Sequence, residues 1–227
     1  MLDFFSSISV LIAALTFIAG VSAWKREFVG KRRIELAESV LALFYEAEDA
    51  IKQIRSPFSF DGEGSTRKHA DNELEAESRI LDQAYVVFER HQKREKLFAQ
   101  IHSMRYRVMA AFGSSAAEPF DELNKIIKEI FLAARMLGTH YWQRQGRVEM
   151  ASEEFKKHLE EMHSYEAVFW CINEDKDKIL PRVRKAVEKL EGITQEAFVT
   201  QDSILSDVID DIRNSITKLK KPFRTKV

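Results

Sequence analysis

The longest apolar stretch of the chain lies near its start, from Phe4 to Trp24, and contains no ionisable side chain. A helix needs about 20 mostly apolar residues to cross the ~30 Å hydrocarbon core of a bilayer. The polar residues in this stretch are small hydroxyl side chains that can bond back to helix carbonyls, and Trp24 stands where an interfacial aromatic is expected. The pattern predicts a transmembrane anchor over residues 1–24.

Two other interpretations of this stretch are weaker. A secretory signal peptide would have a cleavage site, which residues 21–23 (VSA) resemble, but it would also have a basic segment before its apolar core. Here only Asp3 is charged before the stretch. A helix packed on the core of a globular protein is also disfavoured, because such helices usually keep one polar face toward water and this stretch has none.

A basic cluster follows the apolar stretch directly and orients it. Cytoplasmic flanks of membrane spans carry an excess of Lys and Arg. We therefore expect a single-pass protein with its N-terminus outside and its C-terminal part in the cytoplasm. The five residues of this membrane-flank cluster are Lys25, Arg26, Lys31, Arg32 and Arg33.

The rest of the chain shows apolar residues at three- and four-residue steps, which predicts amphipathic helices. Gly and Pro are scarce, with eight and four in the whole chain, so the helices should be long. The fold class predicted is all-α, with the N-terminal transmembrane helix continuing into a long cytoplasmic helical bundle over residues 25–227. Helices are expected over 25–55, 68–112, 119–145, 152–172, 183–193 and 204–219.

Two features refine this picture. The segment 89–96 (ERHQKREK) has no apolar residue, and an unbroken second helix would be about 67 Å long at 1.5 Å per residue, longer than the first cytoplasmic helix. A kink or break is therefore expected there.

The loop that begins at Ser56-Pro57 should end with Ser65 or Thr66 capping the second helix, and Phe58 and Phe60 are interpreted as caps on the bundle end.

Charge and cysteine content exclude some classes of protein. All 35 Lys and Arg residues and all but one of the 36 acids follow Trp24, so the part after it is formally neutral. A nucleic-acid-binding domain usually has a basic excess, so no nucleic acid is expected as a partner. The single Cys171 cannot form an internal disulfide, which agrees with a reducing compartment.

Candidate chemistry is sparse, and neither a catalytic site nor a cofactor is predicted. Glu160 and His163 have the Glu-x-x-His spacing of di-metal helical bundles, but such sites need a second copy of the motif, and none occurs. Cys171 stands between Trp170 and Ile172 and is interpreted as an inert thiol. The aromatic and basic segment 140–147 (HYWQRQGR) is interpreted as structural rather than as a phosphate or base-stacking site.

The C-terminal tail carries a second basic cluster without any acid. Beside a membrane it could contact anionic lipid at about 1 kcal/mol per charge, and a solvated end is the equal alternative. The cluster, a candidate for lipid or partner contact, is Lys218, Lys220, Lys221, Arg224 and Lys226.

Together these patterns predict a membrane-anchored protein that acts by interaction, scaffolding or sensing, without catalysis. Its expected partners are the lipid bilayer and a protein that the sequence does not identify, with homo-oligomers as a further option. The alternative is an oligomeric membrane effector or pore, in which Ser6, Ser9 and Gly20 would help the spans to pack. A metal-binding helical-bundle enzyme ranks last.

Overall fold

The computed structural model describes residues 2–195, 197 and 198, and it describes side chains from residue 16 onward except at residues 18 and 19. The described residues are predominantly helical and contain no strand, which confirms the all-α class. The chain divides into two compact units, Met1–Glu38 with Gly192–Val227, and Ser39–Glu191. Each unit is described by itself.

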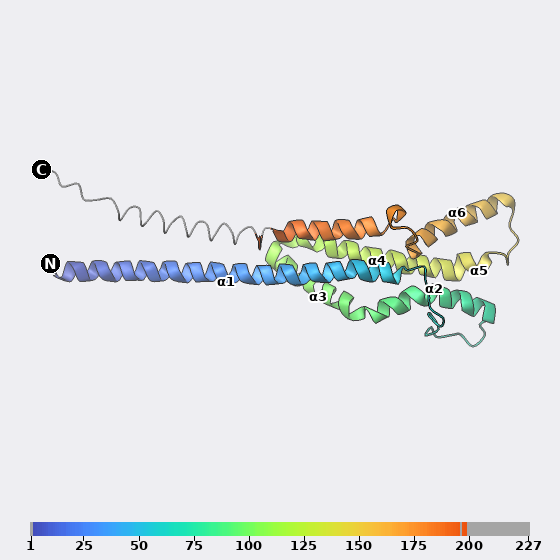
Figure 1. Cartoon of the computed structure of the whole chain (residues 1–227), viewed down its shortest axis with the longest axis horizontal. Coiled ribbons are helices and arrows are strands. Elements are labelled where there is room, and N and C mark those ends of the chain that lie inside the picture. Colours follow the sequence, from blue (N-terminus) through green and yellow to red (C-terminus); the bar gives the residue numbers. More distant parts are fainter. Residues whose placement is uncertain (1, 196, 199–227) are drawn as a thin grey trace. The chain divides into compact units, whose positions relative to one another are not determined.

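Helix α1 runs without a break from Leu2 to Ile54 (Figure 1), so the backbone of the apolar stretch and that of the segment after it form one helix, as predicted. Among the described residues, no helix has an apolar stretch long enough to cross a membrane. Most of the predicted span, residues 4–15, 18 and 19, lies outside the side chains that the structure describes. The transmembrane assignment therefore stays a prediction.

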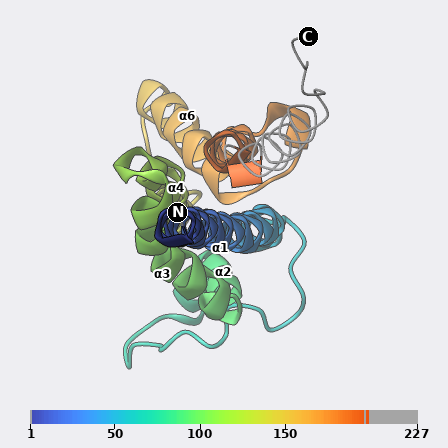
Figure 2. The same cartoon turned by 90° about the vertical axis from the view of Figure 1, so that its left-hand side faces the viewer.

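The unit Ser39–Glu191 is an antiparallel helical bundle. The chain turns back after α1 into α2 (Glu75–Lys93) and α3 (Glu95–Phe112), and reverses again through the 3₁₀ turn Ser114–Ala117 into α4 (Glu118–Met136). Helix α6 (Ser152–Phe169) and, within this unit, residues 180–191 of a helix over 180–195 return along α4. Viewed end-on, α1 has α2 and α3 on one side and α4 on another (Figure 2).

The buried face of α1 is the one that the three- and four-residue spacing predicts. Phe44, Ala47, Ile51 and Ile54 are at most 1% exposed. Phe44 packs edge-on against Phe120 of α4, with ring centroids 4.9 Å apart. Facing α4 residues are equally buried, namely Leu123, Ile126, Ile130 and Ala134. Burial of these side chains from two facing amphipathic helices gives the bundle its core.

The expected break in the second helical stretch is confirmed. Helix α2 ends at Lys93, α3 begins at Glu95, and Arg94 between them has φ −110° and ψ 12°, outside helical geometry. The start of this stretch was predicted wrongly, because α2 begins at Glu75 rather than near residue 68, and Leu74 occupies its N-cap position. Ser65 and Thr66 belong to the loop, and the Thr66 hydroxyl bonds Glu89 of α2 instead.

The end of α4 changes to a π-helical turn over Leu137–Tyr141, followed by the short α5 (Trp142–Arg144). Here the π-helical turn comes very close to α2, and a Cβ on Gly138 would lie 2.6 Å from the Cβ of Ala84. Only a glycine allows this approach. The chain then leaves helix near residue 145, and α6 begins at Ser152, both as predicted. The predicted final helix, 204–219, lies outside the described residues.

Candidate functional site

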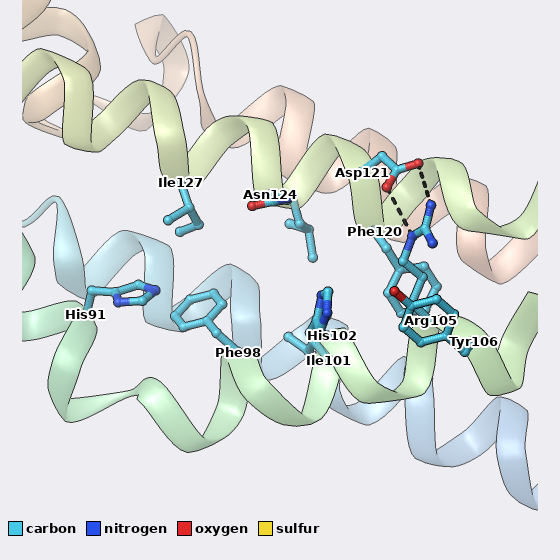
Figure 3. Close-up of a pocket in the computed structure, with 11 residues that line it drawn as sticks. His91, Phe98, Ile101, His102, Arg105, Tyr106, Phe120, Asp121, Asn124 and Ile127 are labelled. Carbon is cyan, nitrogen blue, oxygen red and sulfur yellow. Dashed lines mark hydrogen bonds and ion pairs between the residues drawn. The ribbon is translucent and has the colours of Figure 1, made fainter.

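A pocket lies between α3 and α4 in the bundle unit, and side chains of α2, α3 and α4 line it. It encloses about 260 Å³. Its base is apolar and buried, formed by Ile101, Phe120, Leu123 and Ile127. Figure 3 shows the side chains of α3 and those of α4 facing each other across the open space. The break at Arg94 separates α3, which forms one wall, from α2, which contributes His91.

Aromatic rings form one end of this pocket. The imidazole of His91 stacks on Phe98 with ring centroids 4.7 Å apart and planes at 17°, and it also meets Phe131 edge-on at 5.0 Å. Burial lowers the pKa of His91, so its neutral form is favoured. The His91 ring is half-buried and lies among aromatic side chains.

The other end of the pocket is closed by an ion pair. Nε of Arg105 lies 3.0 Å from Oδ1 of Asp121, and Nη2 lies 3.1 Å from Oδ2 (Figure 3). Both charges of the lining are thereby neutralised by each other. Asn124 and His102 stand at the exposed rim, and neither side chain makes a hydrogen bond within the part of the chain that the structure describes.

A second candidate surface is the aromatic loop, defined here as residues 56–74. Phe58 and Phe60 are each 83% exposed, so their interpretation as caps on the bundle end was wrong. The two phenyl rings are not covered by other side chains, because hydrogen bonds to the loop backbone, rather than packing of these rings, hold the loop in place. With Arg90, Lys93 and Arg94 of the neighbouring segment they line a hollow of about 400 Å³.

Buried charges hold this loop in place. The guanidinium of Arg90 donates to the backbone carbonyl of Ser56 at 2.8 Å, to that of Phe58 at 2.7 Å, and to the carboxylate of Glu63 at 2.5 Å. The neighbouring Glu89 accepts from the backbone N–H of Gly64 at 2.8 Å. The segment 89–96 was noticed in the sequence only because it lacks apolar residues. Its two buried charges, 25 to 34 residues from their partners, gave no local signal.

A third cluster joins three helices. The guanidinium of Arg55, at the end of α1, bonds both carboxylate oxygens of Asp177 and the backbone carbonyls of Ala167, Val168 and Trp170. Burial by itself would raise the pKa of Asp177, but hydrogen bonds from Arg55 and from the backbone of Leu180 hold it below its ordinary value. These contacts satisfy carbonyls at the end of α6 and cap the helix over 180–195, so the cluster is structural.

The other predicted candidates lie apart from one another. Glu160 and His163 are both exposed on α6, whereas His158 is buried, and no metal-binding group of three or more ligands occurs among the described residues. Burial and the nearby Asp177 raise the pKa of Cys171, which agrees with the interpretation of an inert thiol.

The aromatic and basic segment 140–147 packs within the bundle. The Tyr141 hydroxyl donates to Glu161 at 2.9 Å, and Trp142 Nε1 donates to Glu166 at 2.9 Å. Burial, with the Glu161 contact, raises the pKa of Tyr141 to about 12. Arg147 donates to the backbone carbonyl of Ala76 at 3.0 Å. These bonds agree with a structural role for the segment.

The structure describes only one of the two basic clusters. In the membrane-flank cluster, Lys25, Arg26, Lys31 and Arg32 are exposed on α1, and the guanidinium of Arg32 lies 4.6 Å from the ring centroid of Phe28. The C-terminal cluster, residues 218–226, lies outside the described residues, so its contact with lipid stays a prediction. The chain matches no protein-family model, no curated protein and no solved structure.

Proposed function

We propose that the chain is a single-pass, membrane-anchored helical protein that acts as an interaction, scaffolding or sensing module without catalysis of its own. The observation that carries this proposal is the aromatic loop, in which Phe58 and Phe60 stand 83% exposed on a backbone held by buried charges. The bilayer and a protein are its proposed partners, and the bundle is assigned to the cytoplasm.

The energetics of association favour this use of the loop. Exposed aromatic side chains are costly to leave in water, and they are the residues that contribute most at the centres of protein interfaces. Ordering a free loop on binding would reduce affinity. Arg90 and Glu89 already order this loop in the unbound protein, so a partner that covers Phe58 and Phe60 gains the buried apolar area without that cost.

The described part of α1 supports the membrane anchor. Among the described side chains of residues 16–38, five large apolar ones are exposed: Phe17, Val21, Trp24, Phe28 and Val29. Trp24 stacks on Phe28 with centroids 5.7 Å apart, next to the basic cluster. Aromatic rings followed by Lys and Arg are typical of the interface between hydrocarbon and head groups. A surface of this kind needs lipid or a partner helix to cover it.

Reporter fusions test the anchor and its orientation. A reporter joined after Val227 should be active in the cytoplasm, and the protein should remain in the membrane fraction after carbonate washing. Release by carbonate, or activity of the reporter on the opposite side, would contradict this part of the proposal.

Site-specific photocrosslinking tests the loop. A photoreactive phenylalanine analogue at position 58, in native membranes, should give one discrete adduct, and Phe60→Ser should reduce its yield. The same analogue at Ile172, which is 78% exposed on another loop, is the control and should not give that adduct. Identical adducts from both positions would refute a specific surface, and an adduct of twice the chain's mass would favour the homo-oligomeric alternative.

A further inference from the structure

The geometry points to a binding site for a neutral, planar heteroaromatic small molecule in the pocket between α3 and α4. This inference is independent of the proposed partner surface, since the pocket and the aromatic loop share no lining residue. It rests on three properties of the pocket: its size, the rings that form its walls, and the absence of net charge from its lining.

The size suits a small ligand rather than a helix or a large cofactor. At about 260 Å³ the pocket lies just below the usual range of about 300–1,000 Å³ for small-molecule sites, and it is far larger than the volume that one or two waters require. The buried base of Ile101, Phe120, Leu123 and Ile127 offers water no hydrogen bond. Water in such a space is readily displaced by an apolar ligand.

The walls favour a flat ring. His91 and Phe98 already stack nearly parallel at one end, and His102 and Tyr106 meet edge-on at 6.0 Å and 89° further along α3. Aromatic pairs gain most from offset-stacked or edge-to-face arrangements. A flat ring inserted between α3 and α4 could make both kinds of contact with these side chains. Figure 3 shows Phe98 and Ile127 facing each other across the space that such a ring would occupy.

The charges of the lining favour a neutral ligand. Arg105 and Asp121 are bound to each other through two hydrogen bonds, and burial favours the neutral form of His91. An anion or a cation would lose its hydration without gaining an opposite charge. The Asn124 amide, which has no partner among the described residues, provides a donor and an acceptor at the rim, and this selects a ring with a polar atom at its edge.

The test uses the full-length chain in lipid nanodiscs and 5-fluoroindole as the probe, followed by fluorine NMR, with empty nanodiscs as the background. We expect saturable binding at one site per chain. Indole should compete for that site, whereas indole-3-acetate, which is anionic, and cyclohexanol, which is not planar, should compete at least tenfold more weakly. Binding that does not saturate above the lipid background, or equal competition by all three compounds, would overturn the inference.

Three variants locate the binding. Ile127→Phe fills the base of the pocket, and Asn124→Trp covers it from the exposed rim, where it does not disturb the core; each should weaken binding at least tenfold. Leu132→Phe, on the same helix but 54% exposed and outside the pocket, is the matched control and should bind as the wild type does. Retention of wild-type affinity by Asn124→Trp would place the probe elsewhere and refute the site.

Discussion

Arg55 and Asp177 are 122 residues apart in the chain, yet Nη2 of Arg55 lies 2.7 Å from Oδ2 of Asp177, and the two side chains are 0% and 2% exposed. The pair connects the end of α1 to the start of the helix over 180–195. Because Arg55 also donates to three carbonyls near the end of α6, the loss of one side chain would leave several buried polar groups without a partner.

The first prediction follows from this pair. Arg55→Met should lower the free energy of unfolding by about 3–5 kcal/mol, because it leaves a buried, uncompensated carboxylate. Arg184→Met removes ion pairs with Glu48, 3.0 Å long, and with Glu174, 2.8 Å long; because Arg184 is 44% exposed, the loss should have little effect. Urea unfolding followed by circular dichroism measures both, and equal losses in the two variants would contradict the assigned role.

The second prediction concerns the pH dependence of the stability that the Arg90–Glu63 pair gives to the aromatic loop. Hydrogen bonding from Arg90 lowers the pKa of Glu63 below its ordinary 4.5, against the opposing effect of burial. A carboxyl group with a lowered pKa in the folded state stabilises the fold above its unfolded pKa, and this contribution is lost as the pH falls through the folded value. Stability from the Arg90–Glu63 pair should therefore be complete above about pH 5 and decline below it.

Urea midpoints measured from pH 7 to pH 3 check this sign. Glu63→Gln should be less stable than the wild type at pH 7, and the difference should narrow as the pH falls toward 3. Asp61→Asn, in the same loop and exposed, is the control and should follow the wild-type profile. A constant difference between Glu63→Gln and the wild type across the range would show that the pair does not titrate as stated.

The third prediction separates backbone strain from a steric clash. Gly62 and Gly64 both have positive φ, 82° and 86°, but only at Gly64 would a Cβ meet another group, the backbone oxygen of Asp82 at 2.0 Å. Gly62→Ala should cost about 1–2 kcal/mol from the left-handed backbone alone. Gly64→Ala should cost about 1–3 kcal/mol more, because the loop must move away from α2. Similar unfolding free energies for the two variants would refute the close contact.

The fourth prediction tests the contact between the π-helical turn Leu137–Tyr141 and α2. Gly138→Ala should destabilise the protein, because the new methyl group would lie 2.6 Å from the Cβ of Ala84. The double variant with Ala84→Gly should recover part of the loss, giving a favourable coupling of about 0.5–3 kcal/mol. Gly192→Ala, in a helix with no atom within 4 Å of the added Cβ, is the control and should stabilise by about 0.5–1 kcal/mol. Additive effects of Gly138→Ala and Ala84→Gly would contradict the contact.

Several elements could be predicted from the sequence because they depend on neighbours along the chain. The apolar face of α1, the break between α2 and α3, and the start of α6 at Ser152 all follow from local spacing, charge runs and turn residues. The start of α2 could not be placed in this way. Residues 65–74 contain capping residues and charges that would suit a helix, but Glu89 binds Gly64 and Thr66 and keeps that segment in the loop.

The sequence by itself determined the all-α class and the long apolar N-terminal stretch, because helical periodicity and hydrophobic length are properties of short windows of chain. Only the tertiary structure decided that Phe58 and Phe60 face solvent, that Arg55 meets Asp177, and that His91 borders a pocket with residues of α4. Each of these depends on a residue 25 or more positions away: Arg90 holds the loop backbone at Phe58, Asp177 neutralises Arg55, and Phe131 packs against His91. Burial and pairing of that kind depend on how the helices pack against one another, which the spacing of apolar residues within one helix does not determine.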